Sequence, residues 1–69
     1  MIVTRLTLEC LVKQIRYAQD LEHEYVFVVK KILEYIEAEA LNEDVAATYL
    51  VAAYQEYEIA RKFREARTF

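Results

Sequence analysis

The stretch Val45-Ala-Ala-Thr-Tyr-Leu-Val-Ala-Ala-Tyr54 decides the fold. Four of its ten residues are alanine, the strongest helix former, and Thr48 is its most polar side chain. At about 100° per residue, the apolar positions go all the way round such a helix and leave no face for water. A single neighbouring helix cannot cover it. The stretch therefore predicts a bundle of three or more helices, formed within one chain or between chains.

The residues before this stretch predict a turn. Asn42 is a natural N-cap, and Glu43 and Asp44 fill the first helical turn, where negative charge interacts well with the helix dipole. Because asparagine also tolerates the left-handed backbone conformation, we expect Asn42 to end the preceding helix as well. The chain has no glycine and no proline, which favours long helices, short connections and a single domain over residues 1–69.

The first half of the chain carries a helical stripe whose register changes near Asp20. The stripe is made by Leu8, Leu11, Ile15 and Ala18, and then by Leu21, Tyr25, Val28 and Ile32. Two interpretations remain open. Either one continuous helix with a three-residue slip forms a hairpin with the second helix, or Asp20 caps a new helix and the chain has three.

Two segments also carry a strand signal. Residues 2–8 alternate well enough for a short strand, although Thr4 or Thr7 could cap a helix there. Residues 25–29 are five apolar residues in a row, rich in β-branched and aromatic side chains. We expect a helix in both places, because the flanking residues favour one, and the predicted class is all-α.

The second long helix has small residues at a seven-residue interval, namely Ala46, Ala53 and Ala60, which allow a neighbouring helix to approach closely. After Tyr54 the helix is expected to be amphipathic. One side is expected to carry Tyr57, Ile59, Ala60 and Phe63, and the other Glu58, Arg61, Lys62 and Glu65. The predicted helix–helix interface residues are Tyr49, Leu50, Ala53, Tyr54, Tyr57 and Ala60.

Apolar residues make up 57% of the chain, which is high for so small a protein and predicts a buried subunit interface. Residues 32–60 contain seven acids and no base, whereas residues 61–67 are basic. In a hairpin, residues 5–16 would lie beside residues 61–67 and give each chain an acidic and a basic end. We therefore expect an antiparallel homodimer that resembles a four-helix bundle.

Few residues point to chemistry. Asp20 and His23 have the i, i+3 spacing of some metal ligands, so a metal-binding helical bundle is a minor alternative. Cys10 is the single cysteine, and its place beside the apolar stripe suggests packing rather than catalysis. Without glycine there is no phosphate-binding loop and no dinucleotide fingerprint. We expect no catalytic residue, no metal and no cofactor.

The function expected from these observations is a small non-enzymatic protein–protein interaction module acting as a homo-oligomer, such as a regulator, an inhibitor or a chaperone-like adaptor. The six tyrosines support it, since tyrosine is enriched at interfaces. The alternative is a nucleic-acid-binding regulator that uses the basic end of the last helix, made by Arg61, Lys62, Arg64 and Arg67. The lone cysteine and the short apolar runs predict a cytoplasmic protein with no membrane span.

Overall fold

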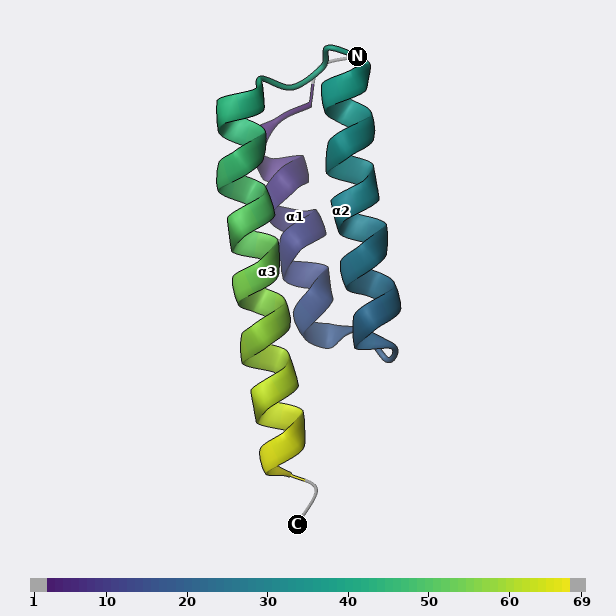
Figure 1. Ribbon diagram of the computed structural model, residues 1–69, viewed down its shortest axis with the longest axis vertical. Helices are drawn as coiled ribbons and strands as arrows, with labels where there is room; N and C mark the ends of the chain where they lie inside the picture. The colour runs from purple at the N-terminus through teal and green to yellow at the C-terminus, as the bar shows by residue number, and fades with distance from the viewer. Residues whose placement is uncertain (1–2, 68–69) are drawn as a thin grey trace.

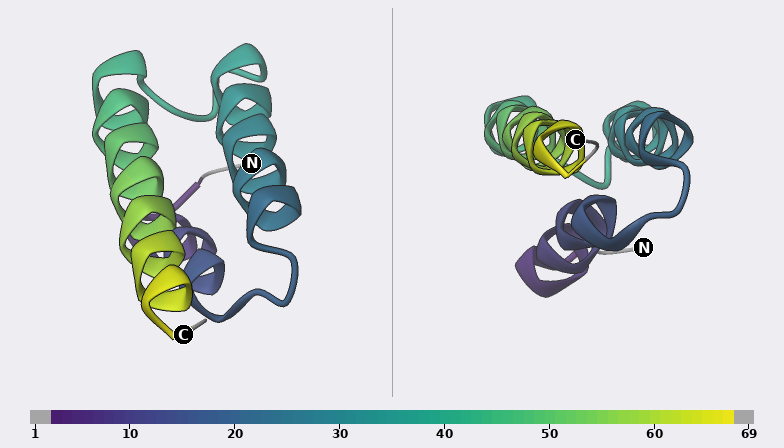
Figure 2. Two further views of the ribbon diagram at one scale, coloured as in Figure 1. Left: turned by 60° about the horizontal axis from the view of Figure 1, so that its bottom comes forward. Right: turned by 90° about the horizontal axis from the view of Figure 1, so that it is seen from below.

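The computed structural model describes residues 3–67, and over these residues the chain is all-helical, as predicted. Helix α1 spans Arg5–Gln14 and continues into a short 3-10 turn, η1, at Ile15–Tyr17. Helix α2 spans Leu21–Glu37, and helix α3 spans Glu43–Ala66. The chain runs down through α1, back up through α2 and down again through α3 (Figure 1). Seen along the helices, α1 packs on one side of the α2–α3 pair (Figure 2).

The break near Asp20 is confirmed, and the alternative of one continuous helix is wrong. Ala18 has an extended backbone, and the Asp20 side chain accepts a hydrogen bond of 3.1 Å from the His23 N–H at the start of α2. The carbonyl groups that this break exposes are also satisfied. The Arg64 guanidinium of α3 donates to the carbonyl oxygens of Arg16 and Ala18. Because a cation suits a helix C-terminus, α3 stabilises the end of η1.

The start of α1 settles the strand-or-helix question for the described residues. Thr4 is the N-cap, and its hydroxyl oxygen accepts a hydrogen bond of 3.2 Å from the Thr7 N–H. The chain is helical from Arg5 onward, so the strand alternative is wrong there. Residue 2 lies outside the described residues. Residues 25–29 lie inside α2, so the expected helix is confirmed at that segment too.

The turn between α2 and α3 is only partly as predicted. Asn42 is the N-cap of α3 and accepts a 2.7 Å hydrogen bond from the Asp44 N–H. It does not end α2, because Glu39 takes the left-handed conformation, with φ at 56°. The Ala40 N–H donates to the Tyr35 carbonyl at 2.9 Å, and the Glu39 N–H donates to Ile36 at 3.0 Å. These two bonds form a Schellman motif in which glutamate occupies the position that glycine favours.

The core lies along the line where the three helices meet. Its buried residues are Leu8, Val12 and Ile15 from the first segment, Leu21, Val28 and Ile32 from α2, and Ala46, Ala53 and Ala60 from α3. The predicted stripes on either side of Asp20 therefore face inward. The seven-residue alanine stripe of α3 does so too, with 0%, 0% and 5% of these residues exposed. Small side chains at the contact let both neighbouring helices approach α3 closely.

One chain by itself does not cover residues 45–54, because Val51 remains 57% exposed and Tyr54 53% exposed. The expectation that residues 5–16 lie beside residues 61–67 is wrong. The break reverses the chain, so Arg5 lies near Leu41 and Val45 at the α2–α3 turn, and only the C-terminal end of α1 approaches the last turns of α3.

The first prediction concerns the alanine stripe. Ala53→Leu should lower the free energy of unfolding by about 1–3 kcal/mol, because the larger side chain overpacks a fully buried position. Ala66→Leu, at an exposed position of the same helix, should change it by no more than about 0.5 kcal/mol. Urea denaturation followed by circular dichroism measures both. Equal stability of the two variants would contradict the packing described for α3.

The second prediction concerns the break. Asp20→Ala should lower the free energy of unfolding by about 0.5–2 kcal/mol, because it removes the N-cap of α2, while Asp20→Asn should retain most of the stability. His23 contributes only its backbone N–H to this cap, so His23→Ala should have little effect. We also expect EDTA to leave the melting temperature unchanged. If EDTA lowered the melting temperature of the wild-type chain but not that of His23→Ala, Asp20 and His23 would be assigned to a metal site instead.

Candidate interaction surfaces

An ion pair joins the end of α1 and η1 to α3. Arg16 donates two hydrogen bonds to the Glu56 carboxylate, from Nε at 2.9 Å and from Nη2 at 2.7 Å. This fork geometry fixes the orientation of both side chains. The hydrogen bond to Glu56 and the charge of that carboxylate raise the pKa of Arg16 above its usual value. The Arg16 side chain remains 50% exposed, and Glu56 only 17%. A cation is thus held at a fixed place on the surface.

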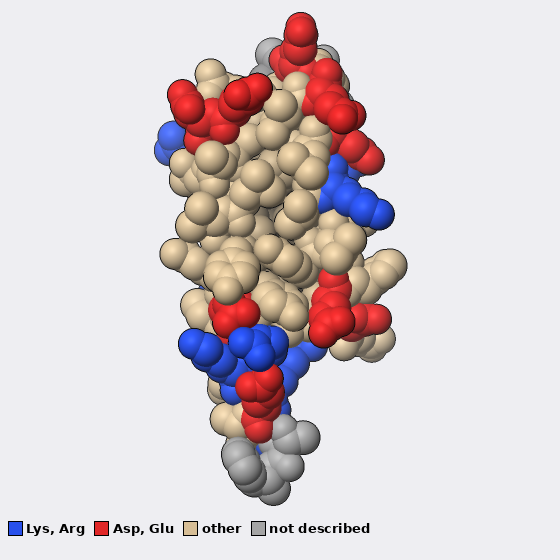
Figure 3. Space-filling model, in the orientation of Figure 1, with Lys and Arg blue, Asp and Glu red and all other residues tan. Residues whose placement is uncertain are grey.

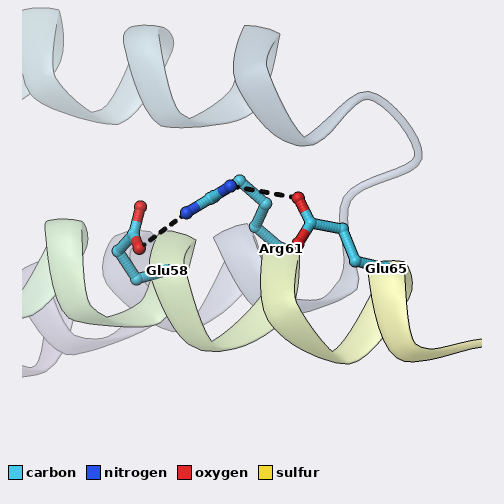
Figure 4. Close-up of polar contacts among 3 residues, drawn as sticks. All are labelled: Glu58, Arg61 and Glu65. Carbon is cyan, nitrogen blue, oxygen red and sulfur yellow. Dashed lines mark hydrogen bonds and ion pairs between the residues drawn. The ribbon is translucent and has the colours of Figure 1, made fainter.

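A second charged group lies along α3. Arg61 donates to Glu58 at 2.9 Å and to Glu65 at 3.0 Å, so its guanidinium lies between two carboxylates of the same helix (Figure 4). The hydrogen bond from Arg61 holds the pKa of Glu58 below its usual range, against the opposing effect of desolvation. The same hydrogen bond raises the pKa of Arg61. Arg61, one of the four residues of the basic end predicted for the last helix, is therefore neutralised within α3.

The residues considered for metal or thiol chemistry have other roles in the structure. The Asp20 carboxylate caps α2, and no group of three His, Cys, Asp or Glu side chains among residues 3–67 could hold a metal ion. Cys10 is exposed, so the expectation that it packs in the core is wrong. The apolar stripe of α1 passes through its neighbours Leu8 and Val12 and leaves Cys10 on the solvent side.

The predicted interface residues of α3 divide into two groups. Ala53 and Ala60 are buried in the chain's own core. The other four are Tyr49, Leu50 and Tyr57, which are half-buried, and Tyr54, which is 53% exposed. The Tyr57 ring stacks on Tyr25 of α2, with centroids 4.7 Å apart and planes 26° apart. The tyrosines thus extend the contact between α2 and α3 out to the surface.

The side of α2 and α3 that faces away from α1 is broad and uncharged (Figure 3). Residues at helical spacing make this α2–α3 face, namely Val26, Val29, Leu33 and Ile36 of α2 and Ala47, Leu50, Val51 and Tyr54 of α3. Val26 and Leu33 are 47% and 46% exposed. Charged side chains lie toward both ends of this face (Figure 3). Leu50 and Tyr54 are predicted as interface residues from the sequence, but the four α2 residues of this face are not. Their 3-4-3 spacing was the available signal, and they form a second stripe next to the buried stripe of α2.

A second apolar surface lies on another side of α3. Here α3 and η1 enclose an open hollow of about 490 Å³, which we call the η1–α3 groove, lined by Arg16, Tyr17, Ile59, Ala60, Phe63 and Arg64. Tyr17, Ile59 and Phe63 are 78%, 58% and 63% exposed. The expected grouping of Ile59 and Phe63 with the buried Ala60 side is therefore wrong. Their own i, i+4 spacing was the signal that they form a separate surface.

The charge at the two ends differs from the expected polarity. The turn end is acidic, with Glu34, Glu37, Glu39, Glu43 and Asp44. The other end holds the basic residues of α3, but the break at Asp20 also brings Glu22 and Glu24 of α2 there. That end is mixed in charge, so the expectation that it is basic overall is not met.

The chain is thus a three-helix bundle with an uncovered apolar face and a basic, apolar groove. None of the helices described is both long and apolar enough to cross a membrane. No protein-family model matches this chain, and neither a characterised protein nor a solved structure matches it.

The third prediction concerns the Glu58 carboxyl. Followed by carbon NMR, its titration midpoint should lie below the usual 4.5 and return toward it in Arg61→Gln. Lys62→Gln should move it less, because Lys62 acts only through its charge. A pKa lowered by folding adds stability above the unfolded pKa, and this contribution is lost as the pH falls through the folded pKa. An unchanged midpoint in Arg61→Gln would contradict the pairing.

Proposed function

We propose that this chain is a small, non-enzymatic protein–protein interaction module that acts as a homodimer, in the class of regulators, inhibitors and adaptors. The observation that carries the proposal is the α2–α3 face. Its residues Val26, Leu33 and Val51 are 47%, 46% and 57% exposed, and this side carries no charged side chain in its middle (Figure 3). Exposed apolar residues that gather on one side of a protein are typical of a protein-binding site.

The proposed occupant of the α2–α3 face is a second copy of the chain. The α2–α3 face runs along α2, whose 17 residues rise about 25 Å at about 1.5 Å per residue, so two copies can align both of their long helices across it. A two-fold axis through the face would bring α2 and α3 of each copy together as a four-helix core, with one α1 on either outer side. The proposed dimer would therefore have the expected four-helix core, to which each chain contributes two of its three helices.

Charge supports an antiparallel orientation of the two copies. The reason is repulsion between the acidic turns, whereas the sequence alone indicated attraction between an acidic and a basic end. The turn end alone is strongly acidic, with Glu34, Glu37, Glu39, Glu43 and Asp44. Two copies with their turns at the same end would place these acids together. With turns at opposite ends, each acidic turn meets the mixed end of the other copy, where Lys62 and Arg67 lie. Apolar burial drives the association and repulsion selects its orientation.

A non-enzymatic role is supported by where the perturbed side chains lie. The groups whose pKa shifts, Arg16, Glu58 and Arg61, are members of surface ion pairs, which account for these shifts. The proposal also includes a cytoplasmic location. Its support is the single exposed thiol of Cys10, which has no second cysteine in the chain to pair with.

The fourth prediction is the oligomeric state. Size-exclusion chromatography with light scattering at micromolar concentration should give twice the 8.2 kDa of the chain. Leu33→Asp combined with Val51→Asp should give the monomer mass, because charges in the centre of the α2–α3 face cannot be desolvated without partners. Leu6→Asp, on α1 and 70% exposed, is the matched control and should remain a dimer. Circular dichroism confirms that each variant is folded.

The orientation is measured with spin labels on Asn42→Cys in a Cys10→Ser background. Antiparallel packing should separate the two labels by about 25 Å or more, since a helix rises about 1.5 Å per residue and α2 has 17 residues. Labels lying side by side would leave the dimer in place and contradict the antiparallel orientation. A wild-type chain of monomer mass would contradict the homodimer.

A further inference from the structure

The η1–α3 groove exposes three large apolar side chains around one hollow. Ile59 and Phe63 project from successive turns of α3, and Tyr17 closes the hollow from η1. More than half of each residue is exposed. The nearby Arg67 guanidinium lies over the Phe63 ring, 5.6 Å from its centroid. The groove therefore combines apolar contact area with cations at its edge.

The charge of this groove has one sign. Its lining includes Arg16 and Arg64 and no acidic residue. Both arginines are held in place, Arg16 by Glu56 and Arg64 by the carbonyl oxygens at the end of η1. By contrast, a second hollow, of about 520 Å³ beside the α2–α3 turn, is lined by both Arg5 and Glu9. Of these two hollows, the η1–α3 groove is the one whose charged lining residues are all cationic.

The groove lies outside the proposed dimer interface. Phe63 follows Tyr54 of the α2–α3 face by nine residues, which is half a turn round the helix at about 100° per residue. A second copy on the α2–α3 face would thus leave the groove open, and its occupant must be a different molecule.

We infer that the η1–α3 groove binds an acidic, amphipathic segment of a partner protein. Two or three large apolar side chains of that segment, at helical spacing, pack between Tyr17, Ile59 and Phe63. Its carboxylates lie against Arg16 and Arg64, where charge-assisted hydrogen bonds to guanidinium groups fix the register. This inference rests on the proposed function, and it names the chemistry of the partner.

A peptide explains the groove better than a nucleic acid does. Nucleic-acid binding draws on cations that contact many phosphates, whereas only two arginines line this groove and the chain carries a net charge of −3. Ile59 is aliphatic and offers no ring for base stacking. The three apolar side chains form a compact cluster suited to the anchor residues of a short helix.

The fifth prediction uses the full chain as bait for a random-peptide library displayed on phage. The selected peptides should be rich in Asp and Glu and should carry large apolar residues three or four positions apart. The tightest peptide is then synthesised with a fluorophore, and its binding is measured by anisotropy. Phe63→Ala and Ile59→Ser should each weaken binding about tenfold or more, as loss of a central anchor does. Replacing the acidic residues of the peptide by amides should also weaken it.

Two controls make the test specific. Leu6→Ala, on an exposed apolar residue of α1, should leave peptide binding unchanged. The Leu33→Asp/Val51→Asp chain should still bind the peptide, so that failure of the dimer and failure of the groove are told apart. If the wild-type chain proves monomeric but selects acidic peptides, the groove inference stands without the dimer.

Three results would overturn the inference. The first is a selection that yields no peptides or peptides without acidic residues. The second is peptide binding that survives Phe63→Ala together with Ile59→Ser. The third is preferential binding, lost in Phe63→Ala, of single-stranded oligo(dT) or of phosphatidylserine vesicles, which would assign the groove to a nucleic acid or a membrane surface.

Discussion

The close approach of α1 and α2 to the alanine stripe of α3 is the contact on which the rest of the structure depends. Ala46, Ala53 and Ala60 are spaced so that all three face the same line, and they are the residues through which α3 enters the core. Because these side chains are small, the volume of the core comes from Leu8, Ile15, Val28 and Ile32 of the other segments. Helix α3 is therefore the element against which both neighbours pack, and its larger apolar side chains lie outside that line, either half-buried beside it or on the surface.

The starts of the helices and most of the buried residues could be predicted from the sequence. Hydrophobic spacing located the core residues of each helix, and the capping chemistry of Thr4, Asp20 and Asn42 located where the helices begin. These features are local, since a cap satisfies backbone groups within one turn. The left-handed residue was harder to place, because Glu39 occupies a position that glycine or asparagine usually takes.

What could not be predicted depended on contacts between distant residues. Whether the chain continued or broke near Asp20 decided on which end Glu22 and Glu24 would lie, and with them the charge of that end. Ile59 and Phe63 could not be separated from Ala60 until the position of η1 was known. The ion pair of Arg16 and Glu56 joins residues forty positions apart, and no periodicity in the sequence indicates it. The α2–α3 face is uncovered because α1 packs on the opposite side of these two helices, and this placement could not be predicted from the sequence either.

The attachment of α1 to the bundle is uneven along its length, and this has a consequence for motion. Its C-terminal end is tied to α3 by the Arg16–Glu56 ion pair and by Arg64 at the carbonyl groups of η1. Its N-terminal end is stabilised by the Thr4 cap, which belongs to the helix itself, and by the packing of Leu8. Segments with fewer tertiary contacts open first in the native state. Among the amides that are bonded within α1, that of Leu8 should therefore exchange before those near Ile15.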